Sequence, residues 1–188
     1  AAAAAGSSPG SGGSGLGLLS SASGSNTSLS SSLSSSFLSL PVVKMASVHP
    51  AVVFTYYKQL FAEGEKRRSY DELKAFTSKL SANPTTDPKL LARCNLRLGE
   101  WQQALVETSN EAVIASVLHA YREATKYDPS AYKSWHSWAL GNFEAISHYE
   151  RQNQPDKIAV HLQPAVAGFF RSILLGPERS LQDVLRLL

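Results

Sequence analysis

Three basic side chains form a set whose types and spacing suggest binding chemistry. Arg93 and Arg97 are four residues apart, so on a helix their guanidinium groups share one face. Lys133 falls on another predicted helix, two elements further along. In a stack of antiparallel helices, two helices separated by a third can border one groove, where three cations can hold a polyanion such as an inositol phosphate. The residues alone also allow, and by themselves favour, a solvated surface with ordinary ion pairs, for instance between Arg97 and Glu100.

Other patterns that could carry chemistry are weaker. Residues 10–15 read GSGGSG and match the letters of a dinucleotide loop, but no predicted strand precedes them and no helix follows. No set of protein-kinase motifs is present. His136 lies between Trp135 and Trp138, where a packed or half-exposed imidazole is the expectation rather than a ligand or a catalyst. Cys94 lies on an apolar stripe and is expected to be a small buried side chain. We therefore expect no catalytic residue, no metal and no cofactor of the chain's own.

Composition divides the chain at about residue 45. Residues 1–44 are almost entirely Ala, Gly, Ser and Leu; the first basic residue is Lys44 and the first acidic one is Glu63. Such a segment cannot bury enough apolar surface to offset its chain entropy. The sequence predicts a low-complexity, disordered segment at 1–45 and a folded region at 46–188.

Charge, cysteine content and hydropathy exclude several classes. The net charge is +3, of which residues 63–188 contribute only +1, from 16 basic and 15 acidic side chains. A nearly neutral folded region does not favour nucleic-acid binding. A single cysteine allows no internal disulfide, which fits a reducing cytosol. The most apolar stretch, 159–175, is interrupted by His161, Gln163 and Arg171, so no transmembrane segment is predicted.

The elements that would position these residues are helices. Asp87-Pro88, Ser109 or Asn110, and Ser130 are expected to cap helix starts, and Gly99 is expected to end one helix. The final pair is divided by Gly176-Pro177, and Pro164 is a second candidate start for the first of them. The predicted helices are 50–63, 69–81, 88–98, 100–107, 111–127, 131–152, 158–175 and 179–188.

A weak internal repeat indicates how these helices pack. The letters LGEW at 98–101 recur as LGNF at 140–143, 42 residues on. This resembles the tetratricopeptide signature, in which glycine lets two antiparallel helices approach closely. The first helix is expected to bury Val52, Tyr56 and Leu60. The expected structural core is Trp101, Trp135, Phe143 and Phe169. The predicted fold class is all-α: a segment of an antiparallel helical-hairpin, tetratricopeptide-like solenoid.

Several longer blocks, in order along 48–188, resemble the FAT region of target-of-rapamycin kinases, which belong to the phosphatidylinositol-3-kinase-related group of serine/threonine protein kinases. The upstream His49-Pro50 and Tyr56-Tyr57-Lys58 fit the same pattern. The main blocks are LLARCNLRLGEW at 90–101, YKSWHSWA at 132–139, NFEA at 142–145, PAVAGFFRSI at 164–173 and LQDVLR at 181–186.

The resemblance implies that this chain is a fragment of a very large kinase and forms part of the helical clamp around its kinase domain. The parent would act in nutrient and growth signalling. Its partners would be the rest of its own polypeptide, a beta-propeller subunit and a large solenoid scaffold subunit. Its location would be cytoplasmic, with recruitment to the lysosome or vacuole surface through the parent complex. ATP and Mg²⁺ would bind only in the absent kinase domain.

The family also binds inositol hexakisphosphate within this scaffold. Arg93 matches an arginine of that site, Lys133 matches a lysine, and Arg97 stands where a relative has lysine. Arginine keeps the charge but changes the geometry of donation. A further basic residue of the site would lie upstream, so the chain would hold part of the pocket.

Two other functions remain open on the sequence. One is a free-standing tetratricopeptide-like adaptor that binds peptides or protein partners in its groove. The other is an enzyme in its own right, which the missing kinase motifs disfavour.

Overall fold

The structure, a computed structural model, describes residues 48–107, 110–179 and 181–187. The segment predicted to be disordered, 1–45, lies outside these residues. Every regular element in the described part is helical, which confirms the all-α fold class. The elements are α2 (Pro50–Ala62), α3 (Lys66–Ser81), α4 (Pro88–Leu105), α5 (Glu111–Tyr127), α6 (Tyr132–Arg151), α7 (Pro155–Leu175), the short 3-10 helix η2 (Pro177–Arg179) and α8 (Leu181–Leu187).

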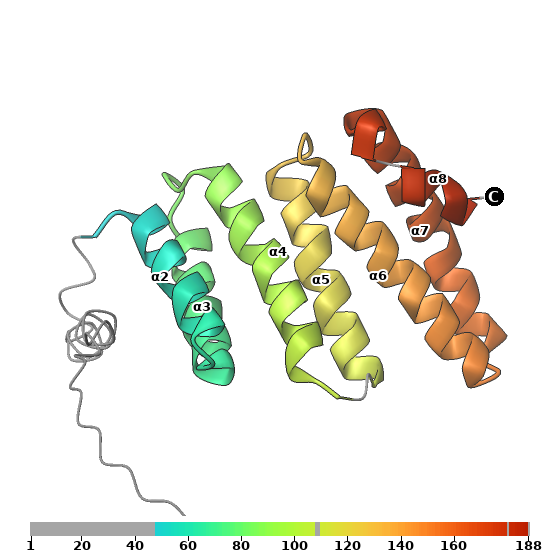
Figure 1. Cartoon of the computed structure of the whole chain (residues 1–188), viewed down its shortest axis with the longest axis horizontal. Coiled ribbons are helices and arrows are strands. Elements are labelled where there is room, and N and C mark those ends of the chain that lie inside the picture. Colours follow the sequence, from blue (N-terminus) through green and yellow to red (C-terminus); the bar gives the residue numbers. More distant parts are fainter. Residues whose placement is uncertain (1–47, 108–109, 180, 188) are drawn as a thin grey trace, which may run out of the picture. The chain divides into compact units, whose positions relative to one another are not determined.

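Consecutive helices lie side by side and run antiparallel, because the connections between them are short (Figure 1). Each of the helices from α2 to α7 packs against the next, and α4 also contacts α6. Two helices that are not consecutive therefore flank the one between them. In this way α3 and α5 border a channel floored by α4, and α4 and α6 border one floored by α5.

Local sequence explains where several helices begin. The Asp87 carboxylate accepts a hydrogen bond from the Lys89 N–H at 3.0 Å, and Pro88 occupies the first turn of α4. Asn110 caps α5 by accepting from the Val113 N–H at 2.9 Å. The predicted cap at Ser130 is wrong. Its hydroxyl donates to Asp128 at 2.6 Å instead, and α6 begins without a side-chain cap.

Gly99 does not end a helix, contrary to the prediction, because α4 continues to Leu105. A Cβ atom at Gly99 would lie 2.4 Å from the Tyr121 ring on α5. A Cβ atom at Gly141 on α6 would lie 3.3 Å from the same ring. The repeated Leu-Gly pair thus marks two close approaches to one tyrosine, and glycine is needed at position 99 for space rather than for chain reversal.

The C-terminal helices also differ from expectation in detail. α7 begins at Pro155, and Pro164 lies inside it instead of starting it. By length and hydropathy, α7 is also the described helix that meets the requirement for crossing a membrane, although the sequence was expected to contain none. One such helix is weak evidence for a membrane span, and α7 packs against α6 while 22% of its most apolar window is buried.

The buried face of the first helix is rotated from the predicted one. Leu60 is buried as predicted, but Val53 and Tyr57 are buried where Val52 and Tyr56 were expected. Val52 is 57% exposed, and Tyr56 is partly buried. A shift of one residue turns the face by about 100°, because a helix has about 3.6 residues per turn.

The four aromatic residues expected in the core have different environments. Trp101 is 5% exposed and stacks on Phe61 with ring centroids 4.3 Å apart, and Phe169 is 1% exposed. The prediction for Phe143 is wrong: it is 38% exposed, although its ring makes a T-shaped contact with Phe169, with ring centroids 6.3 Å apart. Trp135 is half-buried, and its indole N–H donates to the Pro129 carbonyl at 2.9 Å.

Candidate functional site

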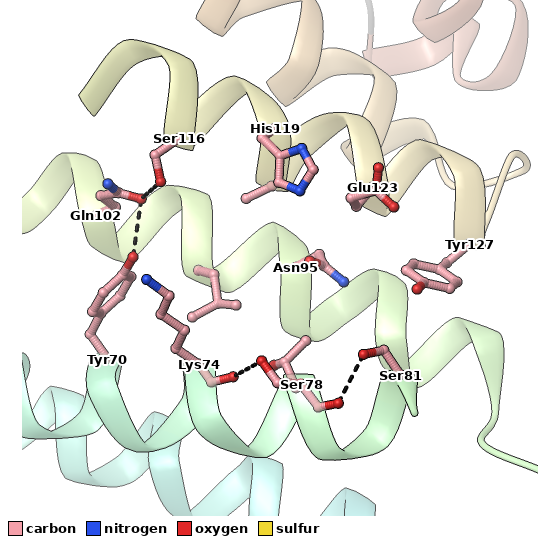
Figure 2. A pocket seen from close by; sticks show the side chains of 13 residues that line it. Tyr70, Lys74, Ser78, Ser81, Asn95, Gln102, Ser116, His119, Glu123 and Tyr127 are labelled. Carbon is pink, nitrogen blue, oxygen red and sulfur yellow. Dashed lines mark hydrogen bonds between the residues drawn. The ribbon is translucent and has the colours of Figure 1, made fainter. Parts of the chain in front are cut away.

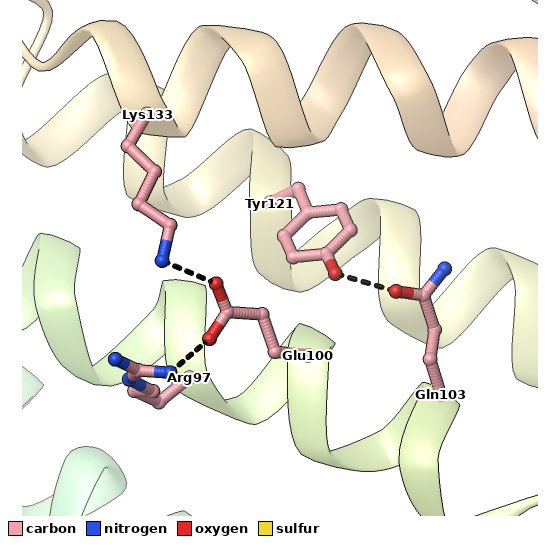
Figure 3. A network of polar contacts seen from close by, with 5 residues as sticks. All are labelled: Arg97, Glu100, Gln103, Tyr121 and Lys133. Atoms are coloured by element: carbon pink, nitrogen blue, oxygen red, sulfur yellow. Dashed lines mark hydrogen bonds and ion pairs between the residues drawn. The ribbon is translucent and has the colours of Figure 1, made fainter.

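Two of the three predicted cations meet at a single carboxylate between α4 and α6 (Figure 3). Arg97 Nη1 lies 2.6 Å from Glu100 Oε2, and Lys133 Nζ lies 2.9 Å from Glu100 Oε1. Glu100 is three residues after Arg97 on α4, whereas Lys133 reaches it from α6. The fold therefore brings Arg97 and Lys133 together, as the stacked-helix argument predicted.

Arg93 occupies a different environment one turn earlier on α4. Its guanidinium lies over the Phe54 ring of α2, 5.8 Å from the ring centroid. In the part of the chain that the structure describes, no carboxylate pairs with Arg93, and its side chain is exposed. A cation over an aromatic face keeps its charge available to other ligands. We call the set Arg93, Arg97, Glu100 and Lys133 the basic groove.

Tyr121 on α5 forms the floor beside these charges. Its hydroxyl donates to Gln103 Oε1 at 2.7 Å (Figure 3). Gln103 Nε2 in turn donates to Glu144 on α6 at 2.9 Å. Burial raises the pKa of Tyr121, and the nearby Glu100 and Glu144 carboxylates raise it further. Tyr121 therefore stays neutral and acts as a fixed donor that ties α4, α5 and α6 together.

The charge balance decides what this arrangement can do. Three cations and one carboxylate leave an excess of two positive charges in the basic groove. The excess favours an anion. An anion that contacts Arg97 and Lys133 must nevertheless replace Glu100 at both, and these partly exposed ion pairs are individually weak.

Of the two ion pairs that Glu100 makes, the sequence predicted only one. The Arg97–Glu100 pair is local, at helical spacing, and was one of the predicted alternatives. The Lys133–Glu100 pair joins residues 33 apart in the sequence across the α4–α6 contact. No local pattern signals such a pair, because it depends on which helices become neighbours.

The other residues that the sequence singled out do not form a second chemical site. His136 is half-buried and stacks on Tyr132, with ring centroids 5.7 Å apart. Cys94 is fully buried, as expected, and burial raises the pKa of its thiol to about 12. No group of three or more metal-ligating side chains occurs among the residues that the structure describes.

Residues 19–188 match the model of the FAT domain family. The match begins inside the segment predicted to be separate from the folded region, and it covers all the described helices.

The chain is also similar to curated proteins from fungi, animals and plants. It is 36% identical over 171 residues to the serine/threonine-protein kinase tor1 of Schizosaccharomyces pombe, an alignment that covers 79% of this chain. It is 35% identical to the serine/threonine-protein kinase mTor of Drosophila melanogaster and 35% identical to the serine/threonine-protein kinase TOR of Arabidopsis thaliana, each over 74% of this chain. The chain spans only 7%, 7% and 6% of the lengths of these three relatives.

Proposed function

We propose, from the premise that the chain belongs to the FAT domain family, that it is a non-catalytic scaffold segment of a target-of-rapamycin-like serine/threonine kinase. The observation that carries this proposal is the family match over 170 residues (19 to 188) together with relatives that are all TOR kinases. An array in which each helix packs on its neighbours suits a part that holds other domains in position.

The proposal extends to the parent protein. The parent is a protein kinase in nutrient and growth signalling, and its kinase domain, with ATP and Mg²⁺, lies elsewhere in the polypeptide. Its partners are a beta-propeller subunit and a solenoid scaffold subunit, and it works in the cytoplasm and at the lysosome or vacuole surface.

The size of the endogenous polypeptide tests the scaffold role. An antibody raised against residues 48–107 is used for immunoprecipitation, and the captured polypeptide is identified by mass spectrometry. We expect one very large polypeptide that also yields peptides of a kinase domain. A free polypeptide of the chain's own 20.3 kDa would contradict the scaffold role and favour the adaptor alternative.

The second part of the proposal is that the basic groove contributes to an inositol hexakisphosphate site through Arg93, Arg97 and Lys133. What supports it is the convergence of Arg97 and Lys133 and the excess positive charge there. A ligand with several phosphates offers each cation a charged acceptor, whereas Glu100 offers one carboxylate to two of them.

Calorimetry with the 188-residue chain and inositol hexakisphosphate tests this site. We expect salt-sensitive binding that is lost in the Arg93→Ala/Arg97→Ala/Lys133→Ala variant. The matched control removes three exposed cations elsewhere, Arg67→Ala/Arg68→Ala/Lys126→Ala, and should keep the affinity. Equal losses in both triple variants, with both folded by circular dichroism, would contradict a specific site.

A further inference from the structure

A separate cleft of about 290 Å³ opens between α3, α4 and α5 (Figure 2). Its walls are α3 and α5, and its floor is the face of α4 that carries Asn95, Leu98 and Gln102. Residues of the basic groove are not among those that line it. We call it the polar cleft, since most of its side chains carry hydrogen-bonding groups and few carry charge.

The floor of the polar cleft presents two unused amide groups. Gln102 Oε1 accepts from Tyr70 Oη at 3.1 Å and from Ser116 Oγ at 2.9 Å, which leaves the Gln102 NH₂ to donate elsewhere. Asn95 Nδ2 donates to the Leu91 carbonyl at 2.9 Å, which leaves Asn95 Oδ1 to accept. Neither free group has a hydrogen-bond partner among the described residues. Neither atom is among the buried polar atoms that lack a partner, so water reaches both, and a ligand with matching groups exchanges those water contacts for direct hydrogen bonds.

The spacing of these amides matches a peptide backbone. Asn95 and Gln102 are seven residues apart on α4, which corresponds to about 10.5 Å along the helix. In an extended chain, an N–H and the carbonyl two residues later lie on one edge, about 9 Å apart. One strand edge can therefore donate to Asn95 Oδ1 and accept from Gln102 Nε2 together.

The size of the cleft also fits an extended chain. Its α3 wall runs from Tyr70 to Ser81, which is about 16 Å of helix and the length of about five extended residues. A volume of about 290 Å³ is at the small end for ligand sites, which suits a narrow backbone with small side chains. An amphipathic helix would require a continuous apolar floor, whereas here the polar Asn95 and Gln102 lie on either side of Leu98.

The two ends of the polar cleft carry different charges. Lys74 on α3 has no ion-pair partner in the described part of the chain, and Figure 2 shows its amine pointing along the cleft toward Tyr70 and Gln102. At the other end, Glu123 already pairs with Lys126 at 2.5 Å. A cleft with one lysine at one end and one glutamate at the other cannot attract a polyanion, so nucleic acid and multiply phosphorylated ligands do not fit.

We propose that the polar cleft binds an extended peptide segment of a partner protein, about five residues long, with one acidic side chain next to Lys74. The peptide lies along α4 between α3 and α5. Asn95 and Gln102 bind its backbone, and Lys74 selects the acidic residue. This proposal does not depend on the basic groove or on the parent being a kinase.

Selection from a displayed library of random seven-residue peptides tests the proposal, with the whole 188-residue chain as bait. We expect enriched sequences that share an acidic residue at one position. The same peptides should bind the Asn95→Ala/Gln102→Ala variant at least about tenfold more weakly. Gln103→Ala, which changes the next amide along α4, one that does not line the cleft, is the matched control and should keep the affinity. No enrichment, or equal binding to the double variant, would overturn the proposal.

A charge reversal separates recognition from folding. The Lys74 side chain is exposed, so Lys74→Glu should leave the helical circular dichroism spectrum unchanged. Selection on this variant should replace the shared acidic residue by a basic one at the same position. If the acidic residue remains preferred on Lys74→Glu, Lys74 does not contact the peptide and the proposed arrangement is wrong.

Discussion

The basic groove and the polar cleft both lie beside α4 and α5, but they use α5 in opposite ways. In the basic groove, α5 is the floor and contributes Tyr121, while the charges come from α4 and α6. In the polar cleft, α5 is a wall and contributes Ser116, His119 and Glu123. Residues 119 and 121 are two apart, about 200° around the helix, so one element serves both sides.

The difference between the two regions lies in how their polar groups are satisfied. In the basic groove, Glu100 already binds Arg97 and Lys133, so a ligand must compete with the protein's own carboxylate. In the polar cleft, amide groups of Asn95 and Gln102 are left over, so a ligand completes bonds that the protein does not make. The comparison teaches that a cluster of cations on a protein surface does not by itself indicate a strong anion site, because the protein's own carboxylates can already occupy those cations.

The largest expected effect comes from removing a buried aromatic side chain of α4, the helix that both regions share. Trp101→Ala should lower the free energy of unfolding by about 3–5 kcal/mol, because the ring is buried and stacked on Phe61. Trp135→Ala should cost only about 1–2 kcal/mol, because that side chain is only partly buried. Urea denaturation followed by circular dichroism measures both. Similar midpoints for the two variants would show that Trp101 does not occupy the core.

A smaller effect is expected where α4 meets α5. Gly99→Ala should destabilise by about 1–2 kcal/mol, because the overpacking against Tyr121 outweighs the better helix propensity of alanine. Thermal melting measures this loss. Adding Tyr121→Leu should recover part of it, so the two changes should be non-additive. Additive losses would mean that the close approach is not what requires glycine.

Alkaline pH should lower the free energy of unfolding through two buried groups, Cys94 beside the polar cleft and Tyr121 in the basic groove. The Cys94 thiol touches Thr77, which lines the polar cleft, and its pKa is raised from 9.0 to about 12 by burial. Between these values the unfolded chain has lost this proton while the folded chain keeps it. Stability from Cys94 is therefore complete below pH 9 and falls by up to about 1.4 kcal/mol per pH unit as pH rises toward 12.

Urea denaturation at pH 8, 9 and 10 measures that loss, with Cys94→Ala as the comparison. The variant should lose less stability between pH 9 and pH 10 than the unmodified chain does. Tyr121, whose pKa is also raised, remains in both proteins and adds to the alkaline loss in each. Identical pH profiles would contradict the burial of Cys94.

The smallest expected effect tests whether Glu100 competes with an anionic ligand for Arg97 and Lys133. Glu100→Gln should raise the affinity for inositol hexakisphosphate by about 2–5-fold, because partly exposed ion pairs to Arg97 and Lys133 each contribute well under 1 kcal/mol. Calorimetry measures the change, with Glu144→Gln as the control. Peptide binding in the polar cleft should be unchanged. Weaker phosphate binding in Glu100→Gln would show that Glu100 orients the cations instead of competing for them.

Local signals predicted the helices well and the sites poorly. Asp87 and Asn110 could be identified as caps because capping involves neighbours within three residues. Gly99 was misread because a missing side chain serves equally to end a helix or to admit a ring from another helix, and only the position of Tyr121 decides. The face of α2 was misjudged by one residue because several adjacent residues are apolar.

Sites that join separate helices were visible only in part. Arg97 and Lys133 were predicted to share a groove from the expected stacking, but the role of Glu100 between them was not. The polar cleft was not predicted at all, because its side chains come from three helices and are of ordinary surface types. Their unpaired amides become apparent only after the other hydrogen bonds are assigned.

The Tyr121 ring, held between Gly99 and Gly141, has a mechanical consequence. Gly99 on α4 faces one edge of the ring, at Cδ1 and Cε1, and Gly141 on α6 faces the opposite edge, at Cδ2 and Cε2. The width of this rigid, buried ring therefore acts as a spacer that sets how closely α4 and α6 can approach each other.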